Sequence, residues 1–356
     1  MKLFLCGDVM TGRGIDQILP APCDPAIDEP WVKSALDYVT LAEQASGPIP
    51  RRADPAYVWG DALAELEQAR PDARIVNLET AVTTCGERAA KGINYRMSPA
   101  NAACLAAAGV DCCVLANNHV LDWGSKGLEE TLDTLHGMGM RTAGAGRDAG
   151  EAHAPARLGN HLLVFAFALE SAGVPADWAA GADTPGVSWL PDLSPQTADA
   201  LVGRILATRR PGDVAVVSIH WGANWGYEVS HRQRDFAHRL IDRGAADLVH
   251  GHSAHHPGRI ELYRERLILY ACGDFLNDYE GIAGHESFRP ELTLMFFASL
   301  DDASGRLREL ALSPMRIRRF RLQRASEEET GWLAARLSGE SALPVEAAAG
   351  GRLRLR

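Results

Sequence analysis

The sequence lacks several features that would place it in a disulfide-rich, secreted or membrane-spanning class. Its seven cysteines include no CxxC pair, which argues against a zinc-thiolate site or a disulfide framework. No uninterrupted apolar stretch reaches the roughly 18 residues of a membrane-spanning helix. An apolar run begins almost directly after Met1 and leaves no room for a signal peptide, so we expect a cytoplasmic protein with no membrane partner.

An excess of basic residues is also absent. The 356-residue chain has 36 Lys and Arg against 46 Asp and Glu, a formal net charge of −10. This balance argues against nucleic acid as a general partner, because phosphate backbones select for positive charge. A hydrophobic content of 46% is ordinary for a globular protein, and the length suffices for one large domain or two modest ones.

Polar side chains follow five short apolar runs of the sequence, at 3–6, 74–76, 112–115, 215–219 and 247–249. Runs of this length, separated by helical patterns, are typical of buried strands in an α/β sheet. Ligands of such sheets bind beyond the carboxyl ends of the strands. Carboxylates, an amide and imidazoles at a shared sheet edge therefore predict a metal site. The residues that follow the runs are Asp8, Glu79, Asn118 with His119, His220, and His250 with His252.

The rest of the pattern predicts an α/β fold with two long excursions. Residues 16–60, with a helix near 31–46, and residues 171–196 are expected to run over the sheet. The tail after 325 has a helical patch and then Ala/Gly-rich sequence with little core. Further helices are expected at 61–70, 99–108, 127–138, 195–209 and 231–243, and further strands at 161–169, 266–272, 291–299 and 315–323.

The segment Asn117-Asn118-His119 is the most specific of the five polar sites. Asn118 offers a neutral oxygen to a cation, while His119 can act as an acid or in support of the metal. Asp122, three residues later, can bond His119 and fix its tautomer. The alternatives are that Asn118 caps the next helix and that Asp8 or Glu79 caps a turn or helix.

Histidines are concentrated in the loop that follows the fifth run. Four of them lie within seven residues, at His250, His252, His255 and His256. Such a density is typical of metal binding or proton transfer, but the spacing does not say which of the four contact a metal directly.

These motifs together resemble the CapA family, which is named for poly-γ-glutamate capsule synthesis and belongs to the calcineurin-like metallophosphoesterase superfamily. The resemblance covers roughly residues 1–325, which we expect to form one catalytic domain, with residues 326–356 as a C-terminal extension. It implies a four-layer α-β-β-α sandwich with the metal centre at the strand ends. The motifs are Gly-Asp-Val-Met from residue 7, Asn-Leu-Glu from 77, Ala-Asn-Asn-His-x-x-Asp-x-Gly from 116, His-Trp-Gly from 220 and Gly-His-x-x-His from 251.

The motifs depart from the superfamily pattern at one of its two metals. The superfamily has Asp-x-His where this chain has Asp8-Val9-Met10, and a thioether is a poor substitute for imidazole on a hard ion. We therefore expect one divalent ion rather than two. Oxygen ligands favour Ca, Mg or Mn over Zn. The expected ligands are Asp8, Glu79, Asn118, His220, His252 and His255.

Spare histidines beside a single cation favour acid and base chemistry. The leading hypothesis is a peptide epimerase, similar to the lasso-peptide epimerase within this family, that inverts a C-terminal Cα. The alternatives are a metal-dependent hydrolase of a phosphoester, γ-glutamyl or other amide bond, and a non-catalytic component of capsule assembly. The expected catalytic residues are His119, Asp122, His252, Asp8 and His220, with Asp274 as a further carboxylate that could orient a histidine.

A peptide substrate is expected to contact aromatic residues near the site and one arginine. Arg96 could pair with a terminal carboxylate, although a surface ion pair is an equal alternative. The aromatic residues could instead be plain loop packing, and the sequence does not indicate an oligomeric state. The expected substrate-binding residues are Arg96, Trp123, Trp221, Trp225 and Tyr227.

Overall fold

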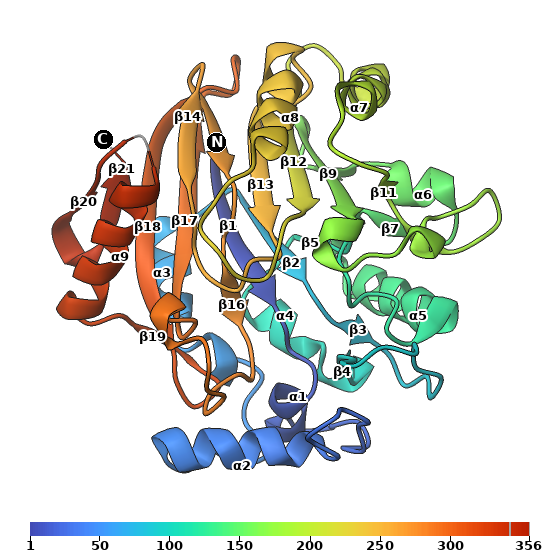
Figure 1. Cartoon of the computed structure of the whole chain (residues 1–356), viewed down its shortest axis with the longest axis vertical. Helices are drawn as coiled ribbons and strands as arrows, with labels where there is room; N and C mark the ends of the chain where they lie inside the picture. The colour runs from blue at the N-terminus through green and yellow to red at the C-terminus, as the bar shows by residue number, and fades with distance from the viewer. Residues whose placement is uncertain (342, 356) are drawn as a thin grey trace.

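Two β-sheets face each other in the computed structural model, which describes residues 1–341 and 343–355 (Figure 1). The larger sheet has the order β20-β21-β18-β17-β1-β2-β5-β6, with β16 beside β1 and β19 beside β18. Its strands are β1 (Lys2–Val9), β2 (Ala73–Leu78), β5 (Cys112–Val114), β6 (Arg141–Ala143), β16 (Asp274–Leu276), β17 (Leu292–Leu300), β18 (Leu307–Ile317), β19 (Leu322–Arg324), β20 (Val345–Ala347) and β21 (Leu353–Leu355).

The second sheet has the order β11-β9-β12-β13-β15-β14, with β8 beside β9. Its strands are β8 (Ala156–Leu158), β9 (Leu162–Leu169), β11 (Trp189–Leu190), β12 (Val214–His220), β13 (Leu248–His252), β14 (Ile260–Tyr263) and β15 (Arg266–Leu269). Two short pairs complete the strands: β3 (Ala81–Val82) with β4 (Arg96–Met97), and β7 (Ala145–Gly146) with β10 (Gly186–Val187). The helices are α1 (Gly14–Ile18), α2 (Ala35–Ser46), α3 (Ala62–Ala69), α4 (Ala103–Ala107), α5 (Gly124–Gly137), α6 (Ala149–His153), α7 (Pro195–Thr208), α8 (His231–Asp242) and α9 (Glu327–Glu340).

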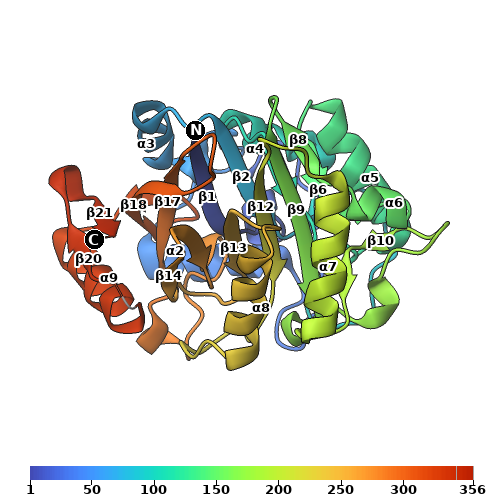
Figure 2. The same cartoon turned by 90° about the horizontal axis from the view of Figure 1, so that it is seen from above.

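The alternation of side chains along β9 explains the layered packing. Leu162 and Val164 belong to the main apolar core between the two sheets, together with residues of β1 and β2. Leu163 and Phe165 point to the other face, where they pack with residues of α7 and α8. Both faces of this central strand are buried, which is why its sequence is an unbroken apolar run. Figure 2 shows α7 and α8 over the outer face of the second sheet.

The expected α/β organisation is confirmed, apart from one predicted strand. The predicted strand at 315–323 is wrong, because the chain reverses within it: Ile317 pairs with Leu322 across an antiparallel turn between β18 and β19. Arg319 and Phe320 make this reversal with φ of 56° and 53°. The predicted helix at 99–108 is shorter than expected, a turn of 3₁₀ helix followed by α4. That the layers form the sandwich of the calcineurin-like superfamily stays a prediction.

The segment after residue 325 contributes to the core, contrary to the expectation from its composition. Helix α9 buries Leu333 and Leu337, and Val345 and Leu353 are buried in β20 and β21. Strand β21 pairs with β18 and so extends the larger sheet. The boundary at residue 325 stays a prediction.

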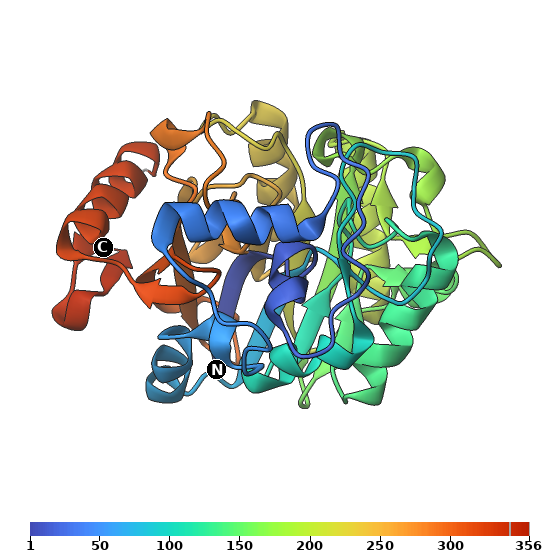
Figure 3. The same cartoon turned by 90° about the horizontal axis from the view of Figure 1, so that it is seen from below.

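The first excursion lies at the end of the sheet toward which β1 and β2 run. Figure 3 shows α2 and the neighbouring loop on this side of the molecule. The turn after β1 holds this excursion through Arg13, whose guanidinium contacts Glu29, Tyr38 and Asp278 in a buried cluster. Among the described residues, no helix combines the length and the hydrophobicity that a bilayer crossing requires.

Two glycines let β1 and β16 approach closely enough to align their carboxylates. Asp8 pairs with Asp274 in parallel register, and the Asp8 amide donates to the Gly273 carbonyl at 2.9 Å. A Cβ on Gly7 would lie 1.6 Å from that carbonyl oxygen. Only a residue without a side chain fits there.

We expect Gly7→Ala to lower the free energy of unfolding by about 3 kcal/mol, because backbone would have to move to admit the methyl group. Urea unfolding measures this. The control is Gly203→Ala in α7, where a Cβ would meet open space and should add about 0.5–1 kcal/mol of stability. Equal effects of the two substitutions would contradict the close approach.

Candidate metal centre and active site

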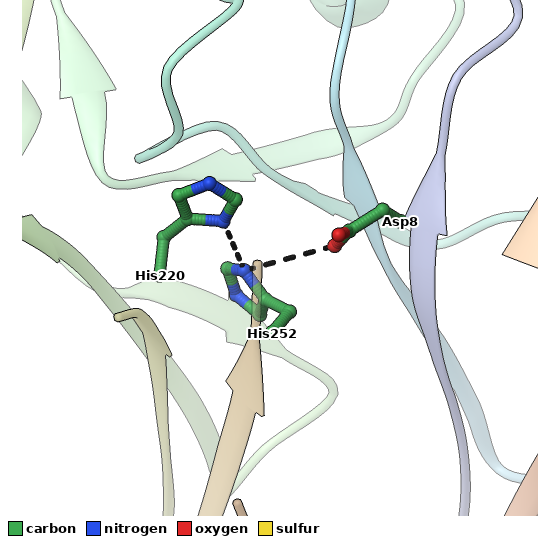
Figure 4. Close-up of side chains that lie close together, drawn as sticks. All are labelled: Asp8, His220 and His252. Carbon is green, nitrogen blue, oxygen red and sulfur yellow. Dashed lines mark hydrogen bonds and ion pairs between the residues drawn. The ribbon is translucent and has the colours of Figure 1, made fainter. Parts of the chain in front are cut away.

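Separate strand ends converge on one buried cluster. His220 ends β12 and His252 ends β13, and the two strands are neighbours in register. Their Nδ1 atoms are 2.7 Å apart, and His252 Nδ1 is 3.9 Å from Asp8 Oδ1 on β1 of the opposite sheet. Figure 4 shows the two imidazoles facing the Asp8 carboxylate. All three side chains are buried.

Two groups of possible metal ligands share Asp8. In one, Asp8, His220 and His252 each offer a donor atom, and all these atoms lie within 4.8 Å of one another. In the other, Asp8 is joined under the same limit by His255 and Asp274. Asp8 is therefore the side chain on which both groups depend.

Glu79 and Asn118 lie at the edge of the first group. Asn118 Oδ1 is 3.1 Å from His220 Nε2, and Glu79 Oε1 is 4.0 Å from the same nitrogen. Asn77 links the acids, because its amide donates to Asp8 Oδ1 at 2.7 Å and to Glu79 Oε2 at 3.3 Å. The six residues predicted as metal ligands thus lie in one neighbourhood.

His119 is held by Asp122 in a buried pair. Its Nδ1 donates to Asp122 Oδ2 at 2.7 Å, which directs Nε2 toward Glu79 Oε1 at 3.8 Å. The backbone N–H of Tyr95 also donates to Asp122 Oδ2, and Lys91 Nζ lies 2.6 Å from Asp122 Oδ1. Burial lowers the pKa of His119 to about 4 despite the adjacent Asp122 carboxylate, so the imidazole is neutral near pH 7.

The structure separates the four histidines that the sequence left undivided. His252 and His255 belong to the donor groups. His250 lies between the sheets, with one nitrogen 3.1 Å from Ser218 Oγ and the other 2.8 Å from the Cys6 carbonyl oxygen. His256 accepts from the Gly226 amide, outside both groups.

Ser253, between His252 and His255, has a strained backbone. Ser253 adopts φ of 105°, a region that residues with a Cβ rarely occupy. Its N–H points at the shared carboxylate and donates to Asp8 Oδ2 at 3.3 Å. The strain therefore accompanies a contact that orients Asp8.

The electrostatics of the cluster favour a cation. Burial, followed by the charge of Asp274, raises the pKa of Asp8 to about 7. Burial and then the charge of Asp8 raise the pKa of Glu79 well above its usual range. Burial lowers the pKa of His220 and of His252 well below the usual value, so these imidazoles are neutral and each has one ring nitrogen with a lone pair for a metal.

The predicted substrate-binding residues divide into two sets. Trp225 and Tyr227 border the site: the Trp225 ring centroid is 5.3 Å from that of His255 and 3.8 Å from that of His285, and Tyr227 packs on His256. The other three, Arg96, Trp123 and Trp221, have structural contacts of their own.

Trp221 is only 2% exposed and lies in the apolar cluster under α8, where Nε1 donates to the Tyr270 carbonyl. Its contact with a substrate stays a prediction. Trp123 is also buried, with Arg96 stacked 4.0 Å from its ring centroid. The Arg96 guanidinium donates to the carbonyls of Cys85 and Asp24, and its pairing with a terminal carboxylate stays a prediction.

Sequence reasoning missed Asp274 as a possible ligand and Lys91 altogether. A signal for Asp274 was present, because Cys272-Gly273-Asp274 repeats the tripeptide Cys6-Gly7-Asp8 after a second apolar run. Lys91 had no such signal, since it lies in an irregular loop between β3 and β4.

Comparison with known proteins places these residues in a family. The model described as "Bacterial capsule synthesis protein PGA_cap" matches residues 2–279. The chain belongs to this family. A relative in Mycobacterium tuberculosis, named "Probable polyglutamine synthesis accessory protein", is 49% identical over 339 residues, which cover 94% of this chain and 89% of that protein.

Two relatives from Bacillus match over shorter stretches. The "PGA biosynthesis protein CapA" of Bacillus subtilis is 30% identical over 164 residues, 46% of this chain and 41% of that protein. The "Capsule biosynthesis protein CapA" of Bacillus anthracis is 26% identical over 197 residues, 54% of this chain and 46% of that protein. Each candidate ligand lies within the part of the chain that matches the capsule synthesis family.

We expect Glu79→Gln to stabilise the metal-free protein, and to do so more at about pH 8 than at about pH 5. The raised pKa means that folded Glu79 keeps a proton that the unfolded chain releases, so wild-type stability falls as pH rises above about 4. Glutamine is neutral at both pH values, so the variant does not lose stability in this way as the pH rises. Urea unfolding of chelator-treated protein at both pH values measures the difference. Glu309→Gln, at an exposed position of β18, should have no such effect, and a pH-independent gain for Glu79→Gln would contradict the explanation.

Proposed function

We propose that this chain is a component of glutamate- or glutamine-polymer synthesis and that it acts there as a metal-dependent amide hydrolase. The names of its relatives support the first part, because they concern polyglutamine, PGA and capsule synthesis. The observation that carries the second part is the buried Asp8 carboxylate, shared by two groups of His and Asp donors. An amide bond is favoured over a phosphoester because these polymers are polyamides.

The donor chemistry fits one divalent ion in the group of Asp8, His220 and His252. Asn118 Oδ1 and Glu79 Oε1 lie within 4.0 Å of His220 Nε2, whereas His252 faces the Nδ1 of the same ring, so these two oxygens flank the group. The second group has the same number of donors, but Met10, where the resemblance leads us to expect an imidazole, is buried against the Tyr279 hydroxyl at 3.8 Å. The carboxylate and amide oxygens in and beside the first group favour Ca, Mg or Mn over Zn.

When bound, a divalent ion would supply Lewis-acid polarisation of the scissile carbonyl. His119 can supply the proton transfer. With Nδ1 donating to Asp122, its neutral Nε2 can accept a proton from the attacking water and pass it to the departing amine. Asp122 holds the ring in this tautomer.

An open cavity of about 610 Å³ lies among residues that follow two strands of the second sheet. Gly222 and Ala223, shortly after His220 at the end of β12, line it together with Ser171, which accepts a hydrogen bond from the Gly222 amide. Arg232 and Gln233 at the start of α8 also line it, and a substrate chain could extend over these residues.

Peptide epimerisation is the second candidate, on one specific observation. The site contains two His–carboxylate pairs, His119 with Asp122 at 2.7 Å and His255 with Asp274 at 2.8 Å. Two such pairs on opposite sides of a Cα could remove a proton and return one to the other face. The names of the relatives favour the polymer-synthesis function over this one.

Incubation of the protein with poly-γ-glutamate in D₂O distinguishes the two reactions. Hydrolysis gives new amino groups and shorter chains, detected with an amine-reactive dye and by size-exclusion chromatography, without deuterium at Cα. Epimerisation gives Cα deuterium at constant length. We expect hydrolysis, and a loss of about 100-fold or more in rate for His119→Asn.

His238→Asn is the matched control for that experiment, because His238 on α8 pairs with Glu261 on β14, away from the donor groups. It should keep the wild-type rate. Unchanged polymer length with every divalent metal supplied would contradict the hydrolase, and deuterium incorporation would favour the epimerase instead.

Metal content tests the single-ion proposal separately. We expect elemental analysis to find about one divalent ion per chain, lost in Asp8→Ala and in His220→Ala because both remove donors of the group of Asp8, His220 and His252. His255→Ala should retain the ion. Two ions per chain, with one lost in each histidine variant, would contradict the proposal while leaving the shared role of Asp8 intact.

A further inference from the structure

Among the described residues, Arg13, Arg96 and Lys91 are cations near the site, and the first two use their guanidinium groups to hold loops of the fold. Arg13 is buried and uses its guanidinium on Asp278, Glu29 and Tyr38. Arg96 donates to two backbone carbonyls and stacks on Trp123. The third cation, Lys91, keeps 27% of its side chain exposed.

The ammonium group of Lys91 lies beside the His119–Asp122 pair, to which we assign the proton transfer. Its Nζ is 2.6 Å from Asp122 Oδ1 and donates to the backbone carbonyl of Asn118. His119 Nδ1 is also near, at 3.3 Å, but this nitrogen donates to Asp122 and has no lone pair for Lys91. An ammonium has three N–H donors, so one of them remains available to a ligand.

The carboxylates around Lys91 explain why a negatively charged ligand would need a cation at this position. Asp122 and Asp274 are buried in this region beside Asp8 and Glu79, and their negative charge opposes an anion that approaches the site. A bound divalent ion offsets part of this negative charge. A partly exposed ammonium beside the His119–Asp122 pair supplies a second, directional attraction for a carboxylate next to the reacting bond.

We propose that Lys91 is a specificity-determining residue that selects substrate units with a free carboxylate over units with a carboxamide. This rests on the proposed function and names the polymer class: glutamate rather than glutamine chains. Lys91 thereby takes the role that the sequence led us to assign to Arg96. The Trp178 ring, with its centroid 5.3 Å from Nζ, forms a wall of the same position.

The test compares two probes that differ only in charge: a short γ-linked glutamate oligomer and the same oligomer with its carboxylates converted to carboxamides. Binding is followed by tryptophan fluorescence directly after mixing, at constant ionic strength because exposed charges are screened by salt. Turnover gives KM and kcat separately. The variants are Lys91→Met, Lys91→Arg and the control Lys33→Met, an exposed lysine outside the site.

We expect the wild type and Lys33→Met to bind the carboxylate oligomer about tenfold more tightly than the carboxamide. Lys91→Met should lose this preference through KM and through binding, and Lys91→Arg should recover most of it. Thermal unfolding checks that each variant is folded.

A preference that persists in Lys91→Met, or a wild type that binds both oligomers equally, overturns the role of Lys91 and leaves the hydrolase proposal standing. A wild type that neither binds nor cleaves either oligomer overturns both. Loss of preference in Lys91→Met together with Lys91→Arg would assign Lys91 to support of the Asn118–Asp122 segment instead of to carboxylate selection.

Discussion

The structure of the site depends on one close backbone contact, between Gly7-Asp8 on β1 and Gly273-Asp274 on β16. The contact brings two carboxylates side by side in a fully buried setting, where like charges repel and water is excluded. Without a cation, the burial and mutual repulsion of these carboxylates destabilise the folded state. The same two effects raise the pKa of Asp8. The side chains proposed to bind the ion therefore lower the stability of the fold when no ion is bound.

Side chains that lie between the two sheets orient the imidazoles of the site. Ser218 and His250 lie on the inner face beneath the cluster, and Ser218 Oγ is 2.8 Å from His252 Nε2. This leaves Nδ1 of His252 for Asp8 and His220. His250 in turn reaches across to the Cys6 carbonyl of the opposite sheet, so the geometry of the ligands is tied to the packing of the two sheets. We infer that a change in sheet packing would alter the site even where no ligand is replaced.

The sequence predicted the neighbourhood of the site well because the rule it relies on is geometric. Parallel strands end at the same sheet edge, which places Asp8 with Asn118, but His220 ends a strand of the second sheet and joins them only because the two sheets face each other. Prediction was poorer where tertiary packing decides the outcome. Arg96 and Trp221 have the composition of binding residues, yet their partners are the Cys85 and Tyr270 carbonyls, which no local pattern identifies.

The same distinction explains the histidine loop. Spacing alone could not divide His250 from His252, because alternate residues of a strand share a face and both point between the sheets. What divides them is depth: His250 meets the Cys6 carbonyl inside the sandwich, whereas His252 lies at the strand end beside Asp8. Beyond the strand, the left-handed Ser253 turns the chain so that its amide meets Asp8 and His255 meets Asp274. The two imidazoles therefore face different carboxylates, His252 that of Asp8 and His255 that of Asp274. With Met10 and Tyr279 filling the adjacent space, the His255 imidazole is left paired with an acid, an arrangement better suited to holding a proton than to completing a second metal shell.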